Sequence, residues 1–152
     1  MSVSNEMRLE FMALSENEAF ARLAVSGFML PLDPTMEELA DVKTAVSEAV
    51  TNAIIHGYAG NRQGMVRMNA LYDEGGELQI QIIDRGRGID DVQQARQPFF
   101  TTSGEEERSG MGFTVMESFM DRVDVDSAPG RGTTVRMRKR IGLREDDIPR
   151  RA

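Results

Sequence analysis

The sequence lacks cysteine and tryptophan, and it has one histidine, His56, among its 152 residues. The absence of cysteine excludes disulfides and thiolate-ligated metal sites, and a single histidine excludes a multi-histidine metal cluster. No apolar run approaches the roughly 20 residues that cross a bilayer, and the first residues lack the basic-then-apolar order of a signal peptide. Basic residues are fewer than acidic ones: the chain has 18 Lys and Arg residues and 25 Asp and Glu residues, which gives a formal net charge of −7. We therefore expect a cytoplasmic protein that binds neither membrane nor nucleic acid directly.

What is present is the composition of an ordinary globular domain. Hydrophobic residues make up 40% of the chain and charged residues 28%. A chain of this length suits one domain that buries roughly 68–70% of the surface exposed by the unfolded chain. We expect this domain to span residues 1–140. Residues 141–152 show no hydrophobic pattern and are expected to form a frayed tail.

The periodicity of the apolar residues predicts the order of the elements. Two S/T-x-x-E capping boxes, Ser15–Glu18 and Thr35–Glu38, predict helix starts. The first helix should end before Pro31, and the second near His56–Gly57, with the glycine in a left-handed conformation. A further helix should begin at Ser109. Alternation predicts strands over residues 6–13, 65–72, 77–84, 121–127 and 133–140.

The predicted elements together indicate an α+β fold. The short turn at residues 73–76 requires the two strands that it joins to be antiparallel. Helices and strands that are segregated in this way form a two-layer α/β sandwich, here a mostly antiparallel sheet with helices covering one face. The glycine-rich stretch 85–112 has little periodicity, and a loop of this length in a compact domain is usually functional or mobile.

The predicted second helix carries a row of polar side chains. Glu48, Asn52 and His56 are spaced four residues apart, so they stack on one side of the helix. A carboxylate beside an amide can hold a metal ion or a reacting hydroxyl. Taken alone, Glu48 and Asn52 are better explained as solvated side chains, and for His56 a pocket wall and a structural helix cap are equally good interpretations.

Three glycine motifs follow along the chain. Asp84 ends a strand and opens D-x-G-x-G, so its carboxylate could accept from the amino group of adenine. Gly110 to Gly112 opens a helix, where free backbone N–H groups attract phosphate. Gly132 and Thr133 enter a strand, and Thr133 could offer a hydroxyl to a ligand. Each motif alone is weak, since an ordinary turn explains it equally well. Neither the Rossmann nor the Walker motif is present.

The motifs taken jointly are much more specific. The series E-x-x-x-N-x-x-x-H, D-x-G-x-G, R-S-G-M-G and G-x-G-T resembles the Bergerat-fold (GHKL) ATPases over nearly the whole chain. Within that superfamily, three segments look like the anti-sigma factor serine kinases: SEAVTNAIIHGY, PFFTTSGEEERSGMGF and GRGTTVRM. The acidic run GEEE departs from the pattern of that group.

The resemblance implies a role for individual residues. Glu48 would be the general base, Asn52 would hold Mg²⁺, and Arg108 would reach the γ-phosphate. Asp84 would recognise adenine, and residues 98–110 would form a lid over the phosphates. The other positions that the resemblance assigns to nucleotide binding are His56, Gly86, Gly88, Ile89, Thr101, Ser109, Gly110, Met111, Gly112, Phe113 and Thr133.

The resemblance also implies a function. A kinase of this group uses ATP, or rests with ADP, and Mg²⁺; it phosphorylates a serine of an anti-anti-sigma factor. As a homodimer it also holds a sporulation sigma factor inactive. Arg22 on the first helix is a candidate partner contact, although a solvated surface charge would explain it as well.

The alternative function is a nucleotide-gated module that binds a sigma factor without kinase activity. Glu48 disfavours this alternative, because a pure binding module needs no general base there. A detached histidine-kinase domain is disfavoured because the one histidine lies in the site itself, and a gyrase-like ATPase by the length of the chain.

Overall fold

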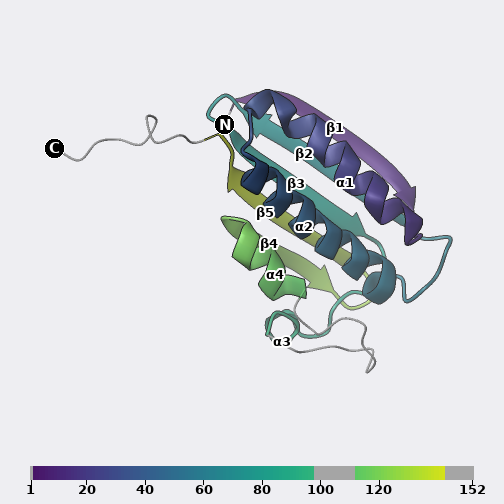
Figure 1. Ribbon diagram of the computed structural model, residues 1–152. Coiled ribbons are helices and arrows are strands. Elements are labelled where there is room, and N and C mark those ends of the chain that lie inside the picture. Colours follow the sequence, from purple (N-terminus) through teal and green to yellow (C-terminus); the bar gives the residue numbers. More distant parts are fainter. Residues whose placement is uncertain (1, 98–111, 143–152) are drawn as a thin grey trace.

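A computed structural model describes residues 2–97 and 112–142, with a five-stranded sheet at its centre (Figure 1). The strands occur in the order β1 (Val3–Met12), β2 (Met65–Asp73), β3 (Glu77–Asp84), β5 (Gly132–Arg140) and β4 (Arg122–Ala128). Every pair of neighbouring strands is antiparallel. Helices α1 (Glu16–Met29) and α2 (Met36–Asn52) lie over one face of this sheet. The predicted α+β sandwich is therefore confirmed.

The two predicted capping boxes have different outcomes. At the start of α2, the Glu38 backbone N–H donates to the Thr35 hydroxyl at 3.0 Å, and Thr35 N–H donates to the Glu38 carboxylate at 2.8 Å. At Ser15 the predicted helix start is confirmed, because α1 begins at Glu16. The capping box itself was predicted wrongly: Ser15 has helical dihedral angles, and among the described residues its side chain makes no capping hydrogen bond. The Glu18 carboxylate instead accepts a hydrogen bond from the Ser47 hydroxyl of α2. A contact between helices has replaced the local cap.

The end of α2 also differs from the prediction. The helix continues into a π-helical turn, η2 (Ala53–Gly57), in which the Tyr58 N–H donates to the Ala53 carbonyl at 3.0 Å. Because this wider turn carries the chain past Gly57, the left-handed conformation predicted there is found later, at Ala59 (φ 49°) and Gly60 (φ 84°). A π-helical turn of this kind often marks a functional site.

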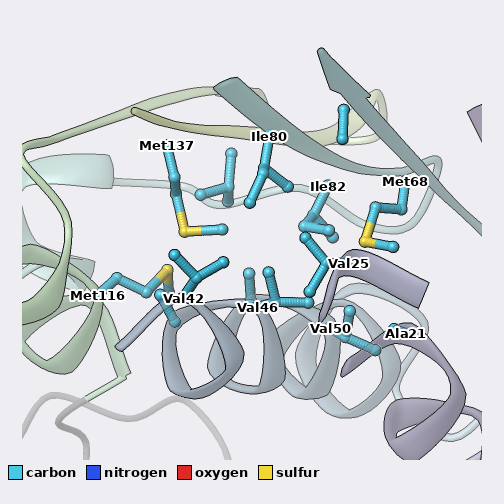
Figure 2. Close-up of a cluster of buried hydrophobic side chains, with 14 of the residues drawn as sticks. Ala21, Val25, Val42, Val46, Val50, Met68, Ile80, Ile82, Met116 and Met137 are labelled. Carbon is cyan, nitrogen blue, oxygen red and sulfur yellow. The ribbon is translucent and has the colours of Figure 1, made fainter. Parts of the chain in front are cut away.

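The core lies between the helices and the inner face of the sheet. Figure 2 shows Val42, Val46 and Val50 of α2 facing side chains that alternate along β2, β3 and β5. Met116 of α4 (Gly112–Phe119) closes one end of the same cluster. The strands supply their part of the cluster from alternate positions, which point to one face: Met68, Ile80, Ile82 and Met137. This packing fixes α2 over the centre of the sheet.

The fold continues beyond the boundary that we expected at residue 140. Ile141 is 3% exposed, and its N–H donates to the Gly76 carbonyl at 2.8 Å. The Gly142 N–H lies 3.2 Å from the Glu38 carboxylate, so Glu38 of the α2 capping box also holds the segment that follows β5. Residues 143–152 of the expected tail lie outside the described residues. Within the described ranges, no helix has the length and apolar character needed to cross a bilayer.

Candidate functional site

A cavity of about 390 Å³ opens at one end of the sandwich. Its walls come from the C-terminal part of α2, the ends of β3 and β5, the segment that follows β3, and the start of α4. The described residues that line it are Ala49, Asn52, Ala53, His56, Gly57, Ile82, Asp84, Arg87, Gly88, Ile89, Asp90, Asp91, Gln94, Ala95, Gly112, Phe113, Thr133 and Val135.

The α2 wall combines polar and very small side chains. Ala49, Asn52, Ala53 and His56 follow one another at i, i+3, i+4 and i+7, so they share one side of the helix. The two alanines leave room beside Asn52. Gly112 opens α4 against the same side chain, because a Cβ added there would lie 2.9 Å from Asn52 Nδ2. The absence of a side chain at the start of α4 therefore leaves the Asn52 amide at the cavity wall.

A buried carboxylate forms the floor of the cavity. Asp84, at the end of β3, is 6% exposed, and its Oδ1 accepts from the Gly86 N–H at 2.9 Å. Burial raises the pKa of Asp84, while hydrogen bonds from the backbone N–H groups of Gly86 and Thr133 lower it in part. Gly57 packs closely on the carboxylate, since a Cβ at Gly57 would lie 2.7 Å from Asp84 Cγ. The floor thus presents oxygen acceptors held by fixed backbone donors.

The segment after β3 is hydrogen-bonded to η2. The Arg87 backbone N–H donates to the Gly57 carbonyl at 2.8 Å, and Arg87 Nε donates to the His56 carbonyl at 2.8 Å. Gly86 lies against the same turn, because an added Cβ would be 1.9 Å from the Gly57 oxygen. Gly88 has φ 75°, and an added Cβ would lie 2.0 Å from the Ala128 oxygen. Side chains at either glycine would push the wall of the cavity out of place.

The third wall is tied together by hydroxyl groups. Thr133, at the start of β5, is 8% exposed and pairs with Asp84 across β3 and with Ser127 across β4. Ser127 Oγ lies 2.8 Å from Thr133 Oγ1 and accepts from the Ile89 N–H at 2.8 Å. Three strands and the segment after β3 therefore meet at this wall.

The structure brings most of the predicted nucleotide-binding residues to one cavity. Gly86 packs against Gly57 of η2 and is not among the lining residues. Among the described residues that line the cavity, Glu48 is absent. Glu48 is half-buried on α2, one turn before Asn52 and next to the lining Ala49. Thr101, Arg108, Ser109, Gly110 and Met111, with the rest of the predicted lid, lie outside the described residues. The predicted residues that do line the cavity are Asn52, His56, Asp84, Gly88, Ile89, Gly112, Phe113 and Thr133.

Sequence reasoning missed the short helix α3 (Val92–Ala95), which covers the cavity on one side. Asp91 caps it by accepting from the Gln94 N–H at 3.0 Å. The D-x-x-Q spacing is a helix-start signal that the sequence carries, but α3 is too short for apolar periodicity to reveal it. Asp90, Asp91, Gln94 and Ala95 are accordingly lining residues that we did not predict.

The cavity offers few side chains that could bind a metal ion. Within residues 2–97 and 112–142, no group of three or more His, Cys, Asp or Glu side chains is arranged to hold one. The Asn52 amide oxygen at the cavity wall is a hard oxygen ligand, and Mg²⁺ often takes only one or two protein ligands while phosphates and waters supply the others. Among the described lining residues, Asn52 is therefore the one that could hold a magnesium ion whose other ligands are phosphates and waters.

Comparison with known proteins agrees with this geometry. Residues 11–139 match the family model described as "Histidine kinase-like ATPase domain". The anti-sigma F factor of Thermoanaerobacter sp. (strain X514) is 56% identical over 142 residues, which make up 93% of this chain and 98% of that protein. The anti-sigma F factor of Bacillus subtilis (strain 168) is 55% identical over 139 residues, 91% of this chain and 94% of that protein.

Solved structures extend the comparison to the fold. The structure of the RsbU and RsbW domains of Rv1364c from Mycobacterium tuberculosis matches with a TM-score of 0.66 and 20% identity, over 91% of this chain and 32% of that one. The catalytic domain of histidine kinase ThkA matches with a TM-score of 0.56 and 13% identity, over 89% of this chain and 96% of that one. At these identities the likeness is one of fold.

Proposed function

This chain belongs to the family of histidine kinase-like ATPase domains, and on that basis we propose that it is an ATP-dependent protein serine kinase that also binds and inhibits a sporulation sigma factor. The observation that carries the proposal is the cavity in which the Asp84 carboxylate and the Asn52 amide line one space. The relatives that are more than half identical over nine-tenths of the chain are named anti-sigma F factors, which supports the regulatory half of the proposal.

Adenine recognition is assigned to the floor of the cavity. The exocyclic amino group of adenine donates hydrogen bonds, and the buried Asp84 carboxylate accepts them. Ile82, Ile89 and Val135 supply apolar lining beside the carboxylate, which suits the faces of a purine ring. The fixed N–H groups of Gly86 and Thr133 hold the carboxylate in place before the ligand arrives.

Phosphoryl transfer is assigned to α2. Phosphoryl transfer depends on positioning and charge neutralisation, which Mg²⁺ supplies when it is bound. Asn52 would hold that ion, and Glu48, one turn earlier, would accept the proton of the incoming serine hydroxyl. Arg108 would reach the γ-phosphate with its planar guanidinium. Gly112 keeps the start of α4 close enough to Asn52 to bound the same space.

The proposed protein partners are a sigma factor and an anti-anti-sigma factor that is phosphorylated on serine. Helix α1 presents large apolar side chains to solvent, with Leu23 71% exposed. Arg22 lies on the same helix, with its Nε 3.6 Å from the Glu18 carboxylate. We assign the partner surface to α1. β1 is an edge strand, which a second copy would protect in a homodimer.

The direct test is a transfer assay. The purified chain is incubated with Mg·ATP and candidate anti-anti-sigma proteins, and phosphate is mapped by mass spectrometry. Phosphoserine on the partner, lost in Glu48→Gln, is the expected result. Binding of ATP and of a sigma factor without transfer to any of the candidates would overturn the kinase half and support the alternative, a nucleotide-gated binding module.

A further inference from the structure

Ser127 lies outside the cavity lining, yet its hydroxyl contacts three groups that shape the cavity. Its Oγ accepts from the Ile89 N–H at 2.8 Å, lies 3.0 Å from the Gly132 carbonyl oxygen, and lies 2.8 Å from Thr133 Oγ1. Thr133 and Ile89 both line the cavity. The Ser127 side chain therefore links the segment after β3, through Ile89, to the start of β5, through Thr133.

The direction of these hydrogen bonds follows from the number of hydrogens that the two hydroxyl groups can donate. Ser127 has a single hydroxyl hydrogen, and the Gly132 carbonyl can only accept. If Ser127 donates to Gly132, the hydrogen in the contact between the two hydroxyls must come from Thr133. All three donors, Ile89 N–H, Ser127 O–H and Thr133 O–H, are then used. The reverse direction would leave the Gly132 carbonyl without this bond, and buried polar groups are normally satisfied.

The direction determines what Thr133 offers to a ligand. With its hydrogen given to Ser127, Thr133 Oγ1 has only lone pairs left for the cavity. Asp84 pairs with Thr133 across β3 and β5, and both residues line the cavity. A floor with acceptors alone favours a purine with an amino group at C6 and disfavours one with a carbonyl at C6.

We propose that Ser127 is a positioning residue that sets purine selectivity, by holding the Thr133 hydroxyl as an acceptor toward the ligand. This inference rests on the proposed function, in which adenine occupies the cavity. Without the Ser127 hydroxyl, the Thr133 hydrogen is free to turn toward the cavity and donate to a C6 carbonyl. Selectivity for adenine over hypoxanthine should then fall even if the cavity keeps its shape.

The test is the ratio of ATP to ITP dissociation constants, measured by calorimetry on the full chain. Ser127→Ala should reduce the preference for ATP by about 2- to 12-fold, the size of one net hydrogen bond. Ser127→Thr keeps the hydroxyl and should retain the wild-type ratio. Ser26→Ala is the matched control, since that serine also donates to a backbone carbonyl, at 2.7 Å from Arg22, but on α1 away from the cavity.

A double variant separates positioning from general support of the wall. In a Thr133→Val background, which has no hydroxyl to orient, Ser127→Ala should leave the ratio unchanged. An equal fall in affinity for ATP and ITP in Ser127→Ala would overturn the inference and leave Ser127 a purely structural residue. A wild-type chain that binds neither nucleotide would overturn the proposed function instead. If Ser127→Ala does not fold, Ser127→Thr with an altered ratio overturns the inference.

Discussion

Asp84→Asn changes one atom at the floor of the cavity and tests the adenine assignment directly. The Asp84 carboxylate already accepts from the backbone N–H groups of Gly86 and Thr133. Asparagine has one acceptor oxygen, and the Gly86 N–H will hold it in the place of Oδ1. The amide NH₂ then replaces the other carboxylate oxygen, so the donor of adenine would meet another donor there.

The size of the effect follows from the burial of the group. An unsatisfied or opposed buried polar group costs about 1–3 kcal/mol, so we expect ATP to bind about 5- to 150-fold more weakly to Asp84→Asn. GTP, which carries a carbonyl at C6, should lose much less affinity or gain some. The assay is competition of each nucleotide against a fluorescent ADP analogue. Equal losses for ATP and GTP would refute the adenine-reading role.

The burial of Asp84 also predicts that the free energy of unfolding depends on pH. Burial raises the pKa of Asp84 above its ordinary value of 3.8, so the folded chain binds this proton more tightly than the unfolded chain. Protonation therefore stabilises the fold: the gain is complete below the unfolded pKa and is lost as the pH rises through the folded pKa. Asp84→Asn has no carboxyl group at this position, so it lacks this gain in stability on protonation. In nucleotide-free urea denaturation, wild type should gain stability relative to the variant on acidification, and a difference independent of pH would contradict the burial argument.

Other positions give further predictions. Glu48→Ala should slow phosphoryl transfer by roughly 10²–10⁴-fold while ATP still binds, and transfer at the wild-type rate would exclude it as the base. Asn52→Ala should weaken binding of Mg·ATP more than binding of ATP in EDTA. Gly86→Ala places a Cβ 1.9 Å from a backbone oxygen and should lower the midpoint of thermal unfolding sharply, whereas Gly27→Ala, with no described atom within 4 Å, should not. Arg22→Glu should weaken sigma-factor binding with ATP affinity intact, and light scattering should give a dimer mass.

Local patterns in the sequence determined the elements and much of the candidate site. Alternation along β3 places Ile82 and Asp84 on one face, because successive strand residues point to opposite sides. Helical spacing places Asn52 of α2 and His56 of η2 on one side of the continuous helix. The Thr35–Glu38 box was predictable because both of its hydrogen bonds join residues three apart. In each case the relevant geometry is contained within a few residues of chain.

Tertiary structure decided what depends on residues far apart in the sequence. The Ser15 box failed because Glu18 found a partner on α2, in Ser47. Which groups surround Asp84 also depends on register across three strands, which brings Ser127 and Thr133 into one row with it. Local periodicity predicts the face on which a side chain lies. It does not predict the neighbour across the sheet, because hydrogen bonding between strands and packing of the core set that register together.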